Sequence, residues 1–174
     1  MRRAIRPAWL VRLARELALG NQTAGQPRNA DLRRATSTAY YAVFHRVAID
    51  TSRNVLGNAS WDESYSIARH VTHASVRQVS VWVKGDTPPR HLDVVVNRLR
   101  ASNEVTQVAL AFLDLYEQRE AADYDHLADF TRPGTLVLVE LADRAVNTVF
   151  KRRDSGDFRA FLGLIALCTN PRHR

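Results

Sequence analysis

The sequence predicts an all-α protein, and three observations support that fold class. Apolar residues recur at helical spacing in each long segment, no segment alternates apolar and polar residues, and the segments are separated by stretches rich in glycine, proline and asparagine. The composition of the 174-residue chain, 45% hydrophobic and 25% charged, is that of an ordinary globular domain. We therefore expect one domain over residues 1–174, built as an up-and-down bundle of four to five helices.

Two helices are expected in the first third of the chain. The first covers residues 9–18, where tryptophan and leucine side chains share one face, and it ends at Gly20. After a polar loop, the second begins with Asn29 as its N-cap and carries an apolar stripe to about Val55. Gly57 marks the end of this second helix, because glycine is the residue that most readily ends a helix.

The remaining helices are expected from similar signals. Ser60 and Glu63 have the spacing of a capping box and begin a helix that runs to Val83, before two adjacent prolines. Further helices are expected over residues 91–116, 136–150 and 158–167. We place the core of the domain at about residues 30–150, with a basic N-terminal helix and a short C-terminal helix flanking it.

The positive charge of the chain is concentrated at its two ends. The formal net charge is +7, and Met1–Arg34 carries eight basic and two acidic residues, whereas Lys151–Arg174 carries six and two. Basic ends on a nearly neutral body favour a polyanion such as RNA as a partner. The alternative is that the arginines, which are 23 of the 25 basic residues, reflect the base composition of the genome.

Nothing in the sequence points to a membrane or to an oxidising compartment. Cys168 is the only cysteine, so it cannot form a disulfide within the chain, and its apolar surroundings suggest a core residue. The first twenty residues are basic, but Arg12, Arg15 and Glu16 interrupt any signal-peptide core. No segment has the roughly 20 consecutive apolar residues of a membrane span. We expect a cytoplasmic protein without a membrane partner.

A first candidate site lies in the expected second helix, in the stretch RRATSTAYYAVFHRV. Arg34, Thr38, Tyr41 and His45 follow one another at steps of four, three and four, so a helix places them on one polar, aromatic face. The alternative is that the aromatic residues of this stretch pack in the core or in an interface. In that case His45 is simply a histidine whose hydrogen bonds are satisfied.

A second candidate site lies in the stretch YEQREAADYDHLADF, residues 116–130. Arg119 is followed, after six residues, by His126. RNA cleavage through the 2′-hydroxyl needs a proton-transfer group and a charge that stabilises the phosphorane, and histidine and arginine supply these without a metal. The alternative is that Arg119 pairs with Asp123, four residues on, and that His126 is a surface residue.

These two stretches, about seventy residues apart, resemble the HEPN superfamily of nucleotide-binding helical domains. The similarity covers about residues 32–125 and is to a small bacterial branch with a Tyr-Tyr-Ala-x-Phe-His helix and a later Arg-x-x-Ala-Asp-Tyr. The resemblance implies a dimeric helical bundle, often a metal-independent endoribonuclease of toxin or antiviral-defence type. Its signature is an arginine, four to six residues and a histidine, and the motifs of two protomers face each other.

The resemblance also implies roles for individual residues. Arg119 is the expected phosphate clamp and His126 the expected general acid and base; the expected supporting or binding residues are Arg34, Tyr41, His45, Asp123 and Tyr124. No cofactor and no metal are implied. The implied partners are RNA, a second copy of the chain, and a protein antitoxin or nucleotidyltransferase.

One residue departs from the pattern of the active enzymes. The position after the arginine is often Asn, Asp or His, but here it is Glu120, an acid that repels phosphate. The sequence therefore leaves two functions open: an endoribonuclease, and a non-catalytic module that binds RNA, a nucleotide or a partner protein.

Two further groups of residues could in principle hold a metal ion. Asp123, Asp125 and Asp129 lie close together, but their spacing matches no closed ligand set, so a solvated acidic turn is the simpler interpretation. His70 and His73 are three residues apart without a third ligand, so a polar helix face is favoured there. We expect no metal site.

Overall fold

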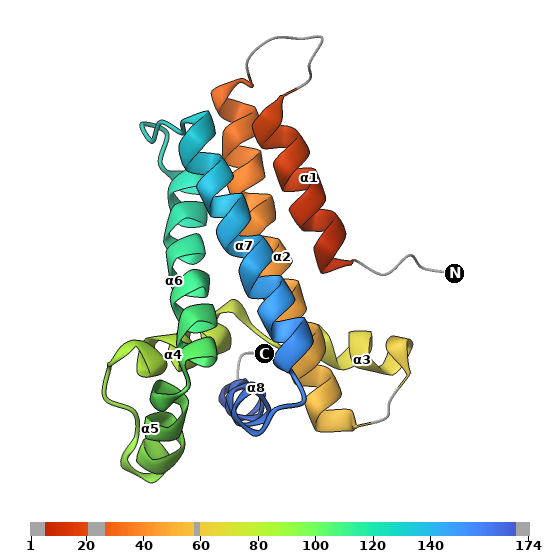
Figure 1. Cartoon of the computed structure of the whole chain (residues 1–174), viewed down its shortest axis with the longest axis vertical. Coiled ribbons are helices and arrows are strands. Elements are labelled where there is room, and N and C mark those ends of the chain that lie inside the picture. The colour runs from red at the N-terminus through yellow and green to blue at the C-terminus, as the bar shows by residue number, and fades with distance from the viewer. Residues whose placement is uncertain (1–5, 21–26, 58–59, 170–174) are drawn as a thin grey trace.

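The computed structural model describes residues 6–20, 27–57 and 60–169, and within these ranges the protein is helical without a β-strand (Figure 1). This confirms the all-α fold class. The basic residues Arg2, Arg3, Arg172 and Arg174, which contribute to the charge of the two ends, lie outside the described residues. Among the helices that the structure describes, none combines the length and the apolar character needed to cross a membrane.

Four long helices run side by side and alternate in direction, which makes an up-and-down bundle (Figure 1). They are α1 (Pro7–Leu19), α2 (Asn29–Leu56), α6 (Asn103–Tyr124) and α7 (Arg132–Arg152). The other elements gather at the end of the bundle where α2 and α7 end (Figure 1). They are α3 (Trp61–Ala68), α4 (His73–Lys84), the 3₁₀ turn η1 (Arg90–Leu92), α5 (Asp93–Ala101) and α8 (Gly156–Cys168).

Helix α2 lies at the centre of the molecule, because it packs against α1, α6 and α7 along its length and against α3, α4 and α8 towards its end. It is buried on nearly every side rather than along one stripe. The largest fully buried side chains of the single hydrophobic core include Tyr40 of α2, Phe112 of α6, and Phe158 and Phe161 of α8. Helices α1 and α8 thus also contribute side chains to this core.

Two of the expected helices are each divided in the structure. The helix expected over residues 60–83 ends at Ala68, and α4 starts at His73 with Thr72 as its N-cap, whose hydroxyl accepts a hydrogen bond from the Ser75 N–H at 3.0 Å. The helix expected over residues 91–116 is interrupted at Ser102, between α5 and α6. Both expectations of one continuous helix were wrong. The Thr72 side chain caps the start of α4, whereas at Ser102 the backbone is extended, with φ of −87° and ψ of 105°, and no side chain caps α6.

Helix ends agree with the sequence at some positions and shift at others. The Ser60–Glu63 capping box is present, and Gly57 ends α2 with φ of 65°. Asn29 is the first residue of α2 and not its N-cap, which is Arg28. Helix α7 starts four residues earlier than expected, at Arg132, because Thr131 caps it by accepting a hydrogen bond from Gly134 N–H at 3.3 Å.

One side chain of α2 fixes the C-terminal end of α6. The guanidinium of Arg33 donates to the carbonyl oxygens of Ala122 at 2.9 Å, Asp125 at 2.8 Å and Ala128 at 3.0 Å. The last carbonyl groups of a helix have no partner within the helix, so a cation placed there satisfies them and complements the helix dipole. Arg33 therefore anchors both the end of α6 and the turn that follows it.

We predict that Arg33→Ala lowers the free energy of unfolding by about 2 kcal/mol, because three carbonyl groups lose a charged donor. The measurement is urea unfolding followed by circular dichroism. The neighbouring Arg34→Ala is the matched control, since Arg34 is exposed and, within the part of the chain that the structure describes, side chains contact it only at its backbone carbonyl, which accepts from the Thr38 hydroxyl. The control should change stability by no more than about 0.5 kcal/mol. Equal effects of the two substitutions would contradict this role of Arg33.

Candidate functional site

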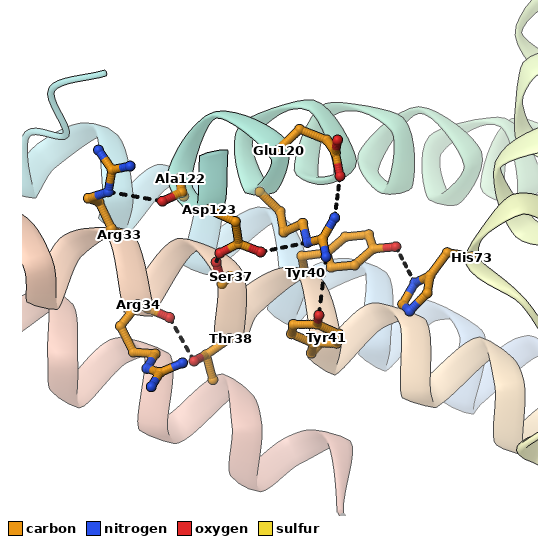
Figure 2. Close-up of polar contacts among 11 residues, drawn as sticks. Arg33, Arg34, Ser37, Thr38, Tyr40, Tyr41, His73, Glu120, Ala122 and Asp123 are labelled. Carbon is orange, nitrogen blue, oxygen red and sulfur yellow. Dashed lines mark hydrogen bonds and ion pairs between the residues drawn. The ribbon is translucent and has the colours of Figure 1, made fainter. Parts of the chain in front are cut away.

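The candidate site lies between α2 and α6, where the two stretches singled out in the sequence meet. Nη2 of Arg119 on α6 donates to the hydroxyl of Tyr41 on α2 at 3.4 Å. Figure 2 shows the polar contacts around this point, with Asp123 between Ser37 and the tyrosines of α2. We call the group the tyrosine–arginine cluster; its members are Tyr40, Tyr41, His45, His73, Arg119, Glu120, Asp123 and Tyr124.

The positive charge of Arg119 is compensated within its own helix. Its side chain is only 16% exposed, it forms an ion pair with Glu120, and its Nε lies 2.8 Å from Oδ2 of Asp123. Ser37 of α2 donates to the other oxygen of Asp123 at 2.5 Å. Burial lowers the pKa of Arg119, but Tyr41 and the two carboxylates outweigh burial, so the pKa is raised above its ordinary value. Arg119 is therefore a fixed cation with its partners already in place.

Aromatic rings surround the same guanidinium. Its central carbon lies 5.8 Å from the ring centre of Tyr40, 5.9 Å from that of Tyr41 and 5.5 Å from that of Tyr124. Cation–π contacts of this kind are attractive and strengthen as water is excluded. Tyr40 is fully buried, whereas Tyr124 is 66% exposed, so the cluster extends from the core to the surface.

Tyr40 also connects the cluster to α4. Its hydroxyl shares a hydrogen bond of 2.5 Å with Nδ1 of His73, and the His73 ring stacks on Phe44 with ring centres 3.8 Å apart. Burial raises the pKa of Tyr40, so its phenol is protonated at neutral pH. Burial, Arg119 and His45 lower the pKa of His73, against a smaller opposing effect of Glu120. His73 is thus a neutral imidazole at neutral pH.

A second histidine lies beside the cluster on α2. The His45 ring centre is 6.2 Å from that of Tyr41 and 5.6 Å from that of Phe44. Burial lowers the pKa of His45, so it is also neutral at neutral pH. Two neutral imidazoles, each able to accept a proton, therefore lie near Arg119. Tyr40 contacts both His73 and Arg119, and Tyr41 contacts both His45 and Arg119.

The structure brings together five of the seven residues expected from the sequence. Tyr41, His45, Arg119, Asp123 and Tyr124 share contacts in the cluster. The remaining two lie apart from it. His126 has an exposed side chain in the turn after α6, Arg34 is exposed on α2, and among the described residues no hydrogen bond, ion pair or ring contact joins either side chain to Arg119.

Sequence reasoning missed His73. The sequence presents His73 only as one of a possible metal-binding pair with His70. In the structure, His73 shares a hydrogen bond with Tyr40, whereas His70 is exposed. A buried tyrosine hydroxyl needs a hydrogen-bond partner, but the sequence does not show which helix provides it. Within the described ranges, no three side chains of His, Cys, Asp or Glu gather where they could hold a metal ion.

The acidic residues after Asp123 have structural partners. Oδ1 of Asp125 accepts a hydrogen bond from the Leu127 N–H at 2.9 Å, which closes a local turn, and Oδ1 of Asp129 accepts one from the Asn29 side chain at 2.8 Å. These carboxylates order the turn between α6 and α7 and connect it to the start of α2.

Comparisons with known proteins add no relative. No protein-family model matches the chain, and neither a curated protein nor a solved structure gives a significant match. The residues of the two stretches and the geometry of the cluster are therefore the features that bear on function.

We predict that the stability of the protein falls as the pH is lowered from 7.5 through 6.5, in part because of His73. Its folded-state pKa lies below 6.5, so the unfolded chain takes up a proton in this range before the folded protein does. His73→Gln cannot titrate, and its amide can still bond the Tyr40 hydroxyl, so the variant should lose less stability on acidification. Urea unfolding at pH 7.5, 6.5 and 5.5 measures the difference.

The control for this experiment is His126→Gln, which removes a histidine outside the cluster and should keep the wild-type dependence on pH. A His73→Gln variant that lost stability with acid as steeply as the wild type would show that His73 is not held neutral.

Proposed function

We propose that the protein is a HEPN-like module that binds RNA and does not cleave it through Arg119 and His126. The observation that carries this proposal is that Arg119 is already engaged within one protomer: its guanidinium forms ion pairs with Glu120 and Asp123 and donates to Tyr41, although its Nε makes no hydrogen bond. A phosphate clamp needs an arginine whose donors are available to the ligand. Here an incoming phosphate has to displace carboxylates and approach a side chain that is only 16% exposed.

The positive charge of the chain supports RNA as the ligand. Among the N-terminal arginines, those already held in ion pairs are less available to phosphate groups. In the basic N-terminal part, Arg12 pairs with Glu16, and Arg15 bonds acids of α7. Arg28 and Arg34, at the start of α2, are exposed, and no ion pair of either is found among the described residues. These two arginines are the best candidates there for contacts with phosphate groups.

We propose the end of α6 as the face through which two copies associate. Tyr124 is 66% exposed and Leu127 is 93% exposed, so two large apolar side chains meet solvent next to the cluster. Exposed apolar side chains beside an aromatic cluster suit an interface, and a two-fold dimer formed there brings the clusters of two protomers close together. This arrangement agrees with the dimer that the HEPN resemblance implies.

A metal-independent endoribonuclease is the second candidate function, and one observation favours it. His73 and His45 are neutral histidines beside Arg119, so one of them can accept the proton of a 2′-hydroxyl. In this mechanism Arg119 exchanges one carboxylate for a phosphate oxygen when RNA binds. His73 and His45 then take the role that the sequence assigned to His126.

The two functions differ in one assay. Purified protein is incubated with single-stranded RNA in EDTA at low salt, and both binding and product ends are measured. We expect RNA to bind and to remain intact, with an affinity that falls steeply as salt is added. Cleavage that leaves 2′,3′-cyclic phosphates, and that is lost in His73→Ala or His45→Ala, would favour the endoribonuclease over the binding module. A protein that neither binds nor cleaves RNA at low salt would contradict both.

A set of variants separates the structural role of Arg119 from RNA binding. We predict that Arg119→Ala lowers the free energy of unfolding by roughly 2 kcal/mol, because it leaves two carboxylates and a tyrosine without their cation. His126→Ala should have little effect on stability. Arg28→Ala and Arg34→Ala should each weaken RNA binding and reduce the slope of log affinity against log salt by about one. An Arg119→Ala variant as stable as the wild type would contradict this structural role of Arg119.

A further inference from the structure

A cavity of about 550 Å³ lies at the C-terminal end of α2, against the turn between α7 and α8. It is separate from the tyrosine–arginine cluster, whose residues on α2 end at His45. The charged side chains that line it are Asp50 and Arg53 from α2, Arg153 and Asp154 from the turn, and Arg159 from α8. A cavity of this volume is large enough for a small organic ligand.

The floor of the cavity is a buried ion pair. Oδ1 of Asp50 lies 2.5 Å from Nη2 of Arg46, with side chains that are 1% and 8% exposed. Arg46 therefore compensates the charge of Asp50 from behind the cavity. Nη1 of Arg153 and Nη1 of Arg53 lie 3.8 Å and 4.0 Å from the same oxygen. Nε of Arg153 also lies 3.5 Å from Oδ2 of Asp154, whose side chain is 92% exposed, so solvent screens this ion pair. With Asp50 compensated by Arg46, Arg153 and Arg159 outnumber Asp154 on the wall.

Aromatic contacts position the guanidinium groups of Arg153 and Arg46, and a side-chain hydrogen bond fixes the backbone of Arg159. The guanidinium groups of Arg153 and Arg46 lie 4.9 Å and 5.3 Å from the ring centre of Phe150. Asn54 donates to the backbone carbonyl of Arg159 at 3.0 Å, which joins the α8 side of the wall to α2. A binding site whose side chains are fixed before the ligand arrives loses less entropy on binding.

Two buried polar atoms of the residues that line the cavity lack a hydrogen-bond partner in the structure, as does Nε of Arg46 behind it. One is a donor, Nη1 of Arg153, and the other is an acceptor, Oδ2 of Asp50. Buried polar atoms are nearly always satisfied, so an unpaired donor and an unpaired acceptor beside a polar cavity indicate a ligand that supplies both. Such a ligand carries an anionic acceptor group and, next to it, a hydroxyl group that donates.

We propose that this cavity binds a ribose phosphate, with the phosphate on Arg153 and Arg159 and a sugar hydroxyl donating to Asp50. Arginine presents a planar fork of donors that matches phosphate oxygens, and carboxylates commonly accept hydrogen bonds from hydroxyl groups. The same chemistry occurs in a free mononucleotide and in the terminal nucleotide of an RNA. This inference stands independently of the proposed function, because it involves neither the cluster nor the exposed arginines at the start of α2.

The test is isothermal titration calorimetry of the full chain at low ionic strength with four probes: AMP, ribose 5-phosphate, inorganic phosphate and ribose. We expect AMP and ribose 5-phosphate to bind at one site, more tightly than phosphate or ribose. Arg159→Gln should weaken that binding roughly tenfold or more, because a charge-assisted contact is lost. Arg90→Gln removes an equally exposed arginine outside the cavity and should bind as the wild type does.

Three results would overturn the proposal: no binding of AMP or ribose 5-phosphate, unchanged binding in Arg159→Gln, or inorganic phosphate binding as tightly as ribose 5-phosphate. Arg159 is exposed, so its substitution does not disturb the buried Arg46–Asp50 pair.

Two RNA probes identify the source of the ligand. If an RNA with a 5′-phosphate binds more tightly than the same RNA with a 5′-hydroxyl, and Arg159→Gln removes the difference, the site takes an RNA end. If the two RNAs bind equally while AMP binding depends on Arg159, the site takes a free nucleotide. Loss of RNA binding in the Arg28 and Arg34 variants with AMP binding intact separates this site from the RNA-binding function.

Discussion

The burial of α2 on nearly every side is the constraint on which the rest of the structure depends. A central helix that packs against six others would usually be uniformly apolar, but α2 carries tyrosines, a histidine, an arginine and an aspartate on buried or half-buried positions. Each of these groups costs free energy unless a neighbouring helix supplies a partner. The cluster at Tyr40 and Tyr41 and the ion pair at Asp50 are two responses to this one requirement, at two levels of the same helix.

The two responses leave different groups available to a ligand. In the tyrosine–arginine cluster, Arg119 is enclosed by carboxylates and rings, and its side chain is 16% exposed. Near the end of α2, Arg46 neutralises Asp50, and Arg153 and Arg159 line a cavity; Asp154, which pairs with Arg153 there, is 92% exposed to solvent. An arginine that holds its own carboxylates stabilises the fold, whereas an arginine on a cavity wall can bind an anion. The site with the more conspicuous sequence motif is therefore the less available to phosphate.

Periodicity and capping residues predicted the fold class, the Ser60–Glu63 capping box and the end of α2 at Gly57, because these signals are local. The spacing of Tyr41 and His45 along α2, and of Arg119 and Asp123 along α6, correctly indicated residues in contact on shared helix faces, whereas Arg34 lies apart from the cluster. It could not indicate that Arg119 faces Tyr41 across two helices, or that the cap at Thr72 divides a helix and places His73 under Tyr40. Contacts between distant segments depend on how helices pack, and residue spacing within one segment does not show this.

The position of His126 illustrates the same limit. With six residues between it and Arg119, it has the spacing of a catalytic motif, but α6 ends at Tyr124 and Arg33 fixes the following turn through its backbone carbonyls. A histidine beyond the end of a helix no longer follows the helical rotation that would return it to the face of Arg119. Within one protomer, the histidines that approach the arginine come instead from α2 and α4. Any chemistry in this cluster would therefore use His45 or His73, neither of which follows Arg119 at the spacing of the motif. The packing around α2 brings these two histidines to the cluster.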